Sequence, residues 1–255
     1  MARRGQALAV AESDSTSAHD EAALLGFLRV IASSDDAEIG RMLESSPALA
    51  VATVHVGATP QDPDSYWFEE IGHHVYAGDT GLHVAAAAYR PAAAKSLIAR
   101  GADVGARNRR GAEPLHYAAD GNAAGAKRDP HAQRAVIESL ISAGADPNAR
   151  DRSGVAPLHR AVRTRSTSAV GALLDNGADL RLGNKQGSTP LHLIPVIEDE
   201  TSGGNRRSRQ GAGGGSGGAA RGVGPPPLLE VLQRMTLLGR NSPGRRCRRA
   251  RGARR

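Results

Sequence analysis

Cysteine and aromatic residues are scarce in this chain of 255 residues. The single cysteine, Cys247, cannot form a disulfide within the chain, so we expect no disulfide framework and a reducing, cytoplasmic location. Aromatic residues make up only 3% of the chain, and one of them is a tryptophan. No apolar run is long enough to span a bilayer, and we expect no membrane association. The apolar run after Arg4 is too short for a secretory signal and soon meets Glu12.

Lysine is also scarce, since the 33 basic residues include only three of this type, Lys95, Lys127 and Lys185. The net charge of +7 is uneven, because residues 201–255 are rich in Arg and contain one acidic residue, Glu230. A basic tail favours nucleic acid as a partner, and this is the alternative function. The tail lacks aromatic residues that could stack on bases, and GC-rich coding alone would give such an Arg bias. A tail translated from a shifted reading frame is a further alternative.

Motifs for catalysis or metal binding are absent or incomplete. His73 and His74 are adjacent, so their side chains point in different directions on a regular backbone, and no third ligand stands at metal-binding spacing. Residues 214–218 match the nucleophile-elbow pattern literally, but they lie in a glycine run with no strand before them and no helix after them, so the match carries no weight. Residues 121–127 lack the Ser or Thr with which a phosphate loop binds magnesium. We therefore expect no enzyme activity, no metal and no cofactor.

A Leu-His pair recurs along the middle of the chain at a regular interval. The four histidines stand 33, 43 and 33 residues apart, at His83, His116, His159 and His192. A Gly-Ala-Asp triplet keeps the same interval and begins at Gly101, Gly144 and Gly177. The longer middle interval equals one period plus a ten-residue insertion at about 121–131. A period near 33 indicates stacked repeats.

Each repeat is expected to form two short helices followed by an extended turn. Pro114, Pro157 and Pro190 suit the first position of a helix, where the missing N–H costs nothing. Thr80 and Thr189 precede such helices, and we expect their hydroxyls to cap them. The second helix should end at the Gly of Gly-Ala-Asp in a left-handed turn. The polar stretches at 108–111, 151–154 and 184–187 are then the extended turns.

The repeat resembles the ankyrin repeat, whose Thr-Pro-Leu-His motif is intact at residues 189–192. The resemblance, which is to stand-alone ankyrin-repeat proteins of bacterial type, implies an all-α repeat fold. It would be an ankyrin-repeat α-solenoid of helix-turn-helix units with β-hairpin fingers. In this family the motif histidine forms hydrogen bonds between repeats. A single repeat cannot bury its apolar face, so the units are expected to stack.

The repeats are expected to lie between two less regular ends. Residues 21–49 resemble a degenerate N-terminal repeat of two helices, and the segment 50–77 is expected to be a long finger or loop. Residues 227–239 have helical periodicity and are either a displaced capping helix or an undocked fragment. The expected segments are a disordered start at 1–20, capping helices with a long loop at 21–74, three complete repeats and a fourth begun at 75–193, a Gly/Arg/Pro-rich linker at 194–226, the displaced helix at 227–239 and a disordered Arg-rich tail at 240–255.

The resemblance implies a non-catalytic protein–protein interaction module that binds through its finger tips and concave face. The family's contact positions fall on Arg109, Arg110, Asp120, Arg152, Ser153, Arg163, Lys185 and Gln186. A row of basic tips favours a protein partner with an acidic patch, because Arg pairs with carboxylates through two hydrogen bonds. Solvated surface charge is the alternative for this row, and an effector delivered to another cell is a weaker functional alternative. The oligomeric state stays open.

Overall fold

The computed structural model describes residues 21–33, 35–120 and 129–193. Helices dominate these residues, and their only strands are β1 (Trp67–Phe68) and β2 (His73–His74). The expectations for 1–20, 194–226, 227–239 and 240–255, and for most of the insertion at 121–131, lie outside the described residues.

Two helices precede the repeats, one over residues 21–33 and α2 over Asp36–Ser45. Asp35 caps α2, because its carboxylate accepts a hydrogen bond from the N–H of Glu38 at 2.9 Å. α2 packs against α4 (Pro91–Ala99), the second helix of the first repeat. The two helices bury apolar side chains at helical spacing, namely Leu24, Phe27, Leu28, Ile31, Ile39 and Leu43.

An irregular segment joins α2 to the first repeat. It contains the 3₁₀ turns η1 (Pro47–Ala50) and η2 (Asp64–Tyr66), followed by β1 and β2. The two strands are antiparallel, with Trp67 opposite His74. Phe68 is fully buried whereas Trp67 is 38% exposed, because successive side chains of a strand point to opposite faces. Isolated bridges attach the segment to the start of the first repeat, from Thr53 to Thr80 and from Gly57 to Tyr76.

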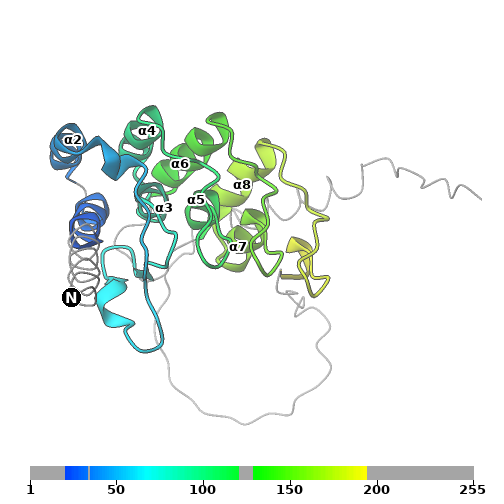
Figure 1. Cartoon of the computed structure of the whole chain (residues 1–255). Coiled ribbons are helices and arrows are strands. Elements are labelled where there is room, and N and C mark those ends of the chain that lie inside the picture. Colours follow the sequence, from blue (N-terminus) through cyan, green and yellow to red (C-terminus); the bar gives the residue numbers. More distant parts are fainter. Residues whose placement is uncertain (1–20, 34, 121–128, 194–255) are drawn as a thin grey trace, which may run out of the picture. The chain divides into compact units, whose positions relative to one another are not determined.

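Three helix pairs follow and stack in two layers (Figure 1). The first helices of the pairs are α3 (Gly81–Ala87), α5 (Pro114–Ala119) and α7 (Pro157–Arg163). The second helices are α4, α6 (Pro130–Ser142) and α8 (Thr167–Asp175). Within each layer a helix packs against the same helix of the next repeat. The 3₁₀ turn η3 (Pro190–Leu193) packs against α7 and begins a fourth unit.

The core lies between the two layers. The first helices contribute small side chains, such as Ala85, Ala118 and Ala161, which let neighbouring helices approach closely. The second helices contribute larger ones, and Leu97 and Ile137 are fully buried. Because these side chains are covered by the next repeat as well as by their own, the architecture is an all-α solenoid.

The first helices are capped by histidine rather than by threonine. In the first repeat, Nδ1 of His83 accepts the backbone N–H of Thr80 at 3.2 Å, and the hydroxyl of Thr80 lies 3.0 Å from the same nitrogen. The same ring nitrogen accepts the N–H of Glu113 and of Ala156 in the next two repeats, where no threonine is present. The expectation of threonine caps was therefore wrong in its donor and acceptor: the Thr80 and Thr189 hydroxyls lie against the histidine rings, and the histidine makes the cap.

The turns at the helix ends use two kinds of residue. Gly101, Gly144 and Gly177 end the second helices with φ of 89°, 104° and 87°, as the sequence predicts. Two residues beyond the ends of α3 and α7, Tyr89 (φ 53°) and Arg165 (φ 57°) occupy the left-handed region without being glycine. In both turns the next N–H bonds back five residues, from Arg90 to Ala85 and from Ser166 to Ala161.

Part of the insertion lengthens a helix. α6 has 13 residues, whereas α4 and α8 have 9 each, so about one extra turn is added at the start of α6. Asp129 caps the lengthened helix, since its carboxylate accepts the N–H groups of His131 and Ala132.

Candidate protein-binding surface

The extended turns between repeats, here called the fingers, are built by one polar side chain each. The side-chain oxygen of Asn108 accepts the N–H groups of Arg110 and Ala112 at 2.9 and 3.0 Å. Asp151 and Asn184 make the same pair of bonds in the following fingers. Each finger is thus a rigid turn whose tip residues have fixed positions.

Neighbouring fingers are joined tip to tip by backbone hydrogen bonds. The N–H of Arg109 donates to the carbonyl of Ala77, that of Arg152 to Arg110, and that of Lys185 to Ser153, at 2.7 to 3.0 Å. The joint requires glycine, because a Cβ on Gly111 (φ 72°) would lie 2.9 Å from the nitrogen of Arg152. The tips therefore form one continuous edge rather than independent loops.

The motif histidines hold each finger to the helix before it. Nε2 of His83 bonds to the carbonyl of Ala112 at 3.1 Å, and His116 and His159 bond in the same way to Val155 and Ser188 at 3.0 Å. Because Nδ1 accepts from the cap residue, the proton must be on Nε2 and the ring neutral. Burial lowers the pKa of all three imidazoles, that of His116 to about 4.

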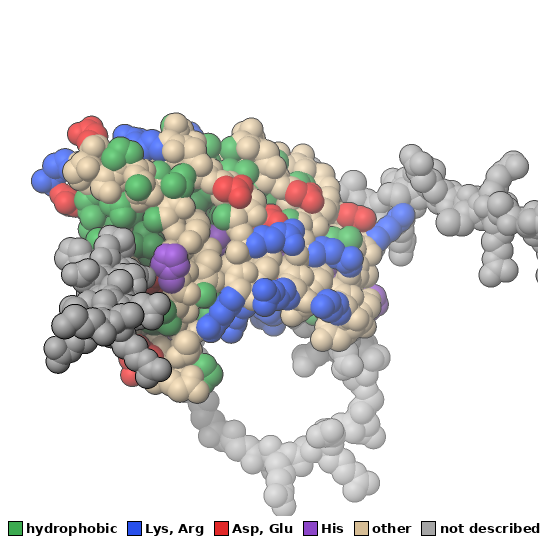
Figure 2. Space-filling model, in the orientation of Figure 1, with side chains coloured by type: hydrophobic (Ala, Val, Ile, Leu, Met, Phe, Trp, Pro, Cys, Tyr) green, Lys and Arg blue, Asp and Glu red, His purple; other side chains and the backbone are tan. Residues whose placement is uncertain are grey.

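The tip side chains make the edge basic. Arg110, Arg152 and Lys185 are exposed, and Lys and Arg side chains gather over the finger side of the repeats (Figure 2). Asp151, the acidic residue of its finger turn, faces Arg160 at 3.3 Å and accepts backbone N–H groups. Its charge is thus already partnered, whereas the tip cations face solvent. Ser153 and Gln186, the other predicted tip residues, are also exposed.

Arg109 behaves differently from the other tip cations. Its guanidinium lies 5.0 Å from the ring centre of Tyr76 and donates to the carbonyl of Ala58. The side chain is half-buried and ties the first finger to the segment before the first repeat. Arg110 also contacts Tyr76, with its guanidinium 4.1 Å from the ring centre, but unlike Arg109 it stays exposed.

The predicted helix positions form a cluster of charges beside the fingers. Asp120 lies 3.6 Å from the guanidinium of Arg163 and 3.6 Å from that of Arg160. Arg160 also faces Asp151 and is well buried, with 12% of its side chain exposed. Asp120 and Arg163 therefore partner each other across two repeats, while the basic tips remain available.

The family comparison agrees with this geometry. The pattern described as "Ankyrin repeat" matches residues 77–109 and 110–152, and the pattern described as "Ankyrin repeats (many copies)" matches residues 140–194. This chain is an ankyrin-repeat protein. Ankyrin repeats generally mediate protein–protein interactions and are typically not catalytic. No curated protein matches the chain.

Beside the fingers, the ankyrin stack contains a largely buried contact that the sequence analysis missed. Tyr117 and Arg160 follow the motif histidines of successive repeats, and the guanidinium lies 6.0 Å from the ring centre of Tyr117. The ring of His73 lies 4.8 Å from Tyr117 on the other side. The sequence could have indicated this contact, because the position after the motif histidine holds a large side chain in both of these repeats.

A buried polar network anchors the first finger of the ankyrin stack. Asp79 is 1% exposed, and its carboxylate accepts from the amide of Asn108 at 2.9 Å and from the hydroxyl of Tyr117 at 3.1 Å. The N–H of Tyr76 donates to the same carboxylate at 2.7 Å. These bonds satisfy a carboxylate that burial would otherwise destabilise strongly.

The described part of the ankyrin-repeat chain contains no group of three or more His, Cys, Asp or Glu that could hold a metal. The ring of His73 contacts Tyr117 and that of His74 contacts Trp67, and both rings lie near the ring of Tyr76. Within the same residues, no helix has the length and apolar character needed to cross a membrane.

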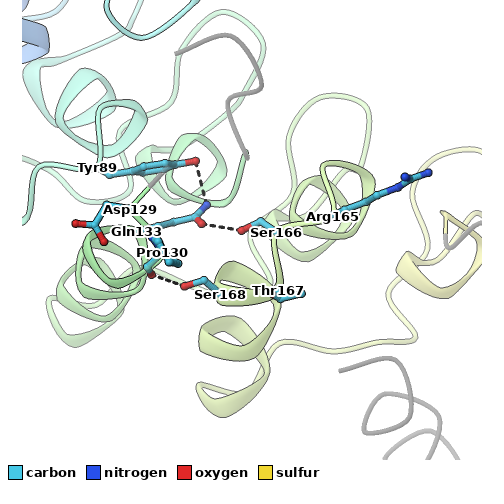
Figure 3. A pocket seen from close by; sticks show the side chains of 8 residues that line it. All are labelled: Tyr89, Asp129, Pro130, Gln133, Arg165, Ser166, Thr167 and Ser168. Atoms are coloured by element: carbon cyan, nitrogen blue, oxygen red, sulfur yellow. Dashed lines mark hydrogen bonds between the residues drawn. The ribbon is translucent and has the colours of Figure 1, made fainter. Parts of the chain in front are cut away.

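A pocket of about 260 Å³ lies among the turns at Tyr89 and Arg165 and the start of α6 (Figure 3). Gln133 crosses it, donating to Tyr89 at 3.1 Å and accepting from Ser166 at 2.7 Å. The hydroxyl of Ser168 donates to the carbonyl of Pro130. The polar groups of the pocket thus bond to one another and connect three successive ankyrin repeats.

Proposed function

We propose that this ankyrin-repeat protein is a non-catalytic, cytoplasmic module that binds a protein partner with an acidic patch. The observation that carries the proposal is the continuous edge of fingers, on which Arg110, Arg152 and Lys185 are exposed while the neighbouring carboxylates are partnered within the chain. A row of cations on fingers whose backbone is already fixed favours a complementary row of carboxylates, because little loop freedom is lost on binding. Asp120, Ser153, Arg163 and Gln186 border this row and would form its polar rim.

The first prediction tests the row by reversing its charge. We expect Arg152→Glu with Lys185→Glu to weaken partner binding by about tenfold or more, since attraction to the partner's carboxylates becomes repulsion. The partner would first be recovered by affinity capture from cells that produce the protein. Its dissociation constant would then be measured by calorimetry against both the unaltered chain and the variant.

A matched control separates local contacts from net charge. Lys95→Glu with Arg100→Glu makes the same change in charge at two exposed positions of the other helix layer, one in α4 and one at its C-cap. This control should bind the partner with nearly unchanged affinity. The finger variant should unfold at the same urea concentration as the original chain, whereas the control should unfold slightly earlier, because Arg100 donates hydrogen bonds to Ser96 at the end of α4. Equal weakening by the two pairs would remove the finger row from the binding site.

Deleting residues 201–255 distinguishes the alternative function. Partner capture should survive the deletion if the fingers bind. Loss of capture, together with loss of binding to nucleic acid, would favour an Arg-rich tail as the functional segment.

A further inference from the structure

An exposed tryptophan stands beside the basic fingers. Trp67, the chain's one tryptophan, is among the exposed large hydrophobic residues of the described part of the chain. Its ring is held by the β1–β2 pairing and by an edge contact with the ring of His74, with centroids 4.7 Å apart. A fixed, partly exposed tryptophan can contribute much binding energy, because little conformational freedom is lost when a partner covers it.

The tryptophan is connected to the finger row through a series of ring contacts. The ring of His74 lies 6.4 Å from that of Tyr76, and the guanidinium of Arg110 lies 4.1 Å from the ring centre of Tyr76. From Arg110 the tip-to-tip hydrogen bonds continue to the next fingers. We call this surface the aromatic–basic strip, and it consists of Trp67, His74, Tyr76, Arg110, Arg152 and Lys185.

The two ends of the strip differ in charge. Glu69 and Glu70 are exposed in the turn between β1 and β2, next to Trp67. The finger end carries the exposed cations Arg110, Arg152 and Lys185. Carboxylates of a partner are therefore attracted at the finger end and repelled at the hairpin end, which fixes the direction in which a segment can lie.

We propose that the aromatic–basic strip binds one peptide segment of a protein partner, with a bulky apolar side chain on Trp67 and acidic residues on the finger tips. This inference rests on the proposed function and adds the apolar anchor and the direction of the segment. Single-stranded nucleic acid is disfavoured, because the guanidinium of Arg110 already lies on the Tyr76 ring and two carboxylates flank Trp67.

The test is a selection from a library of random peptides displayed on phage, using the full-length chain. The selected peptides should share an apolar or aromatic position followed, in one constant order, by several Asp or Glu residues. A synthetic copy of the strongest peptide, made without tryptophan, should shift the fluorescence of Trp67 to shorter wavelength, because the peptide covers the ring. The signal can be assigned to Trp67, since the chain contains one tryptophan.

Two variants assign the ends of the peptide. Trp67→Ser should lower the affinity for the selected peptide about tenfold, and the variant should bind this peptide no better than a version with serine at the apolar position. Trp67→Phe should keep much of the original affinity. Val51→Ser is the matched control, since Val51 is 54% exposed in the same irregular segment but outside the strip. Arg152→Glu with Lys185→Glu should lower the affinity for both peptides, the selected one and the version with serine in place of the apolar residue.

The outcomes separate this inference from the proposed function. Selection of acidic peptides without an apolar position, and equal binding to Trp67→Ser, would overturn the strip while leaving the acidic partner in place. Failure to enrich any acidic peptide would overturn both. A shift of Trp67 fluorescence by oligothymidylate but by no selected peptide would make the strip a nucleic-acid surface and overturn the inference.

Discussion

The imidazoles of His83, His116 and His159 combine burial with two required hydrogen bonds, one accepted at Nδ1 and one donated from Nε2. Protonation at Nδ1 would replace an accepted bond with a repulsive N–H pair inside the stack. This explains in structural terms why burial lowers the pKa of these rings, that of His116 to about 4. Each ring links two repeats, so its charge state affects the interface and not only the local helix.

The second prediction is that stability falls as pH drops below about 6.5, the ordinary histidine pKa in the unfolded chain. Between that value and the folded pKa, the unfolded chain binds more protons, so the stabilisation is complete above pH 6.5 and is lost progressively towards about pH 4. For His116 alone the loss at pH 5 is roughly 2 kcal/mol. Urea unfolding at pH 8 and pH 5 measures it.

His116→Gln is the control for this pH dependence. The variant should be less stable at pH 8, yet it should lose about 2 kcal/mol less than the original chain between pH 8 and pH 5. An unchanged slope would show that other groups cause the acid sensitivity.

Individual residues differ in how far the sequence predicts them. The histidine bonds between repeats were expected from the motif, and the structure confirms them. The contacts of the Arg109 side chain with Tyr76 and Ala58 could not be predicted, because both partners lie in a segment that lacks the repeat pattern. Trp67 was missed as a surface residue for a related reason, since a strand of two residues is too short to show alternation.

The turns between paired helices contain the clearest local strain. Arg165 follows α7 with φ of 57°, a conformation that is unfavourable for residues with a Cβ. The backbone bonds of the turn, from Arg165 to Val162 and from Ser166 to Ala161, hold it there. From the sequence, left-handed turns are predicted only where glycine stands, so the turns at Tyr89 and Arg165 could not be found from residue type.

The third prediction follows from this geometry. Arg165→Gly should stabilise the chain by about 0.5–1 kcal/mol, because removing the Cβ relieves more strain than glycine adds in unfolded-state entropy. The measurement is the urea midpoint at pH 8, well above the histidine transition. Arg165 is exposed, so loss of its side chain removes little packing.

Arg165→Ala serves as the comparison for this turn. It removes the same side chain but keeps the Cβ, and it should therefore give no stabilisation. If alanine stabilised as much as glycine, the gain would come from the lost charge and not from the backbone.

Across the stack, each repeat completes its hydrogen bonding and its core in the next one. His83 donates to Ala112, the finger at Arg109 is bonded to Ala77, and the side chains of α4 pack against α6. The 33-residue period predicts this arrangement, because identical units that stack must meet at identical positions. The sequence does not predict the charge cluster at Asp120, since Arg160 and Arg163 reach it from the following repeat.

The fourth prediction tests whether the repeats can fold singly. A fragment of residues 77–109 should lack a cooperative unfolding transition, because Leu82 and Leu97 are fully buried in a chain where α5 and α6 cover α3 and α4 on one side and α2 packs against α4 on the other. Far-ultraviolet circular dichroism in increasing urea should show a disordered spectrum for this fragment and one cooperative transition for residues 21–193. The same fragment should not bind the acidic partner even at high concentration, since the edge of fingers exists only where successive tips are bonded. A folded fragment that bound the partner would show that single fingers, and not their stacking, create the surface.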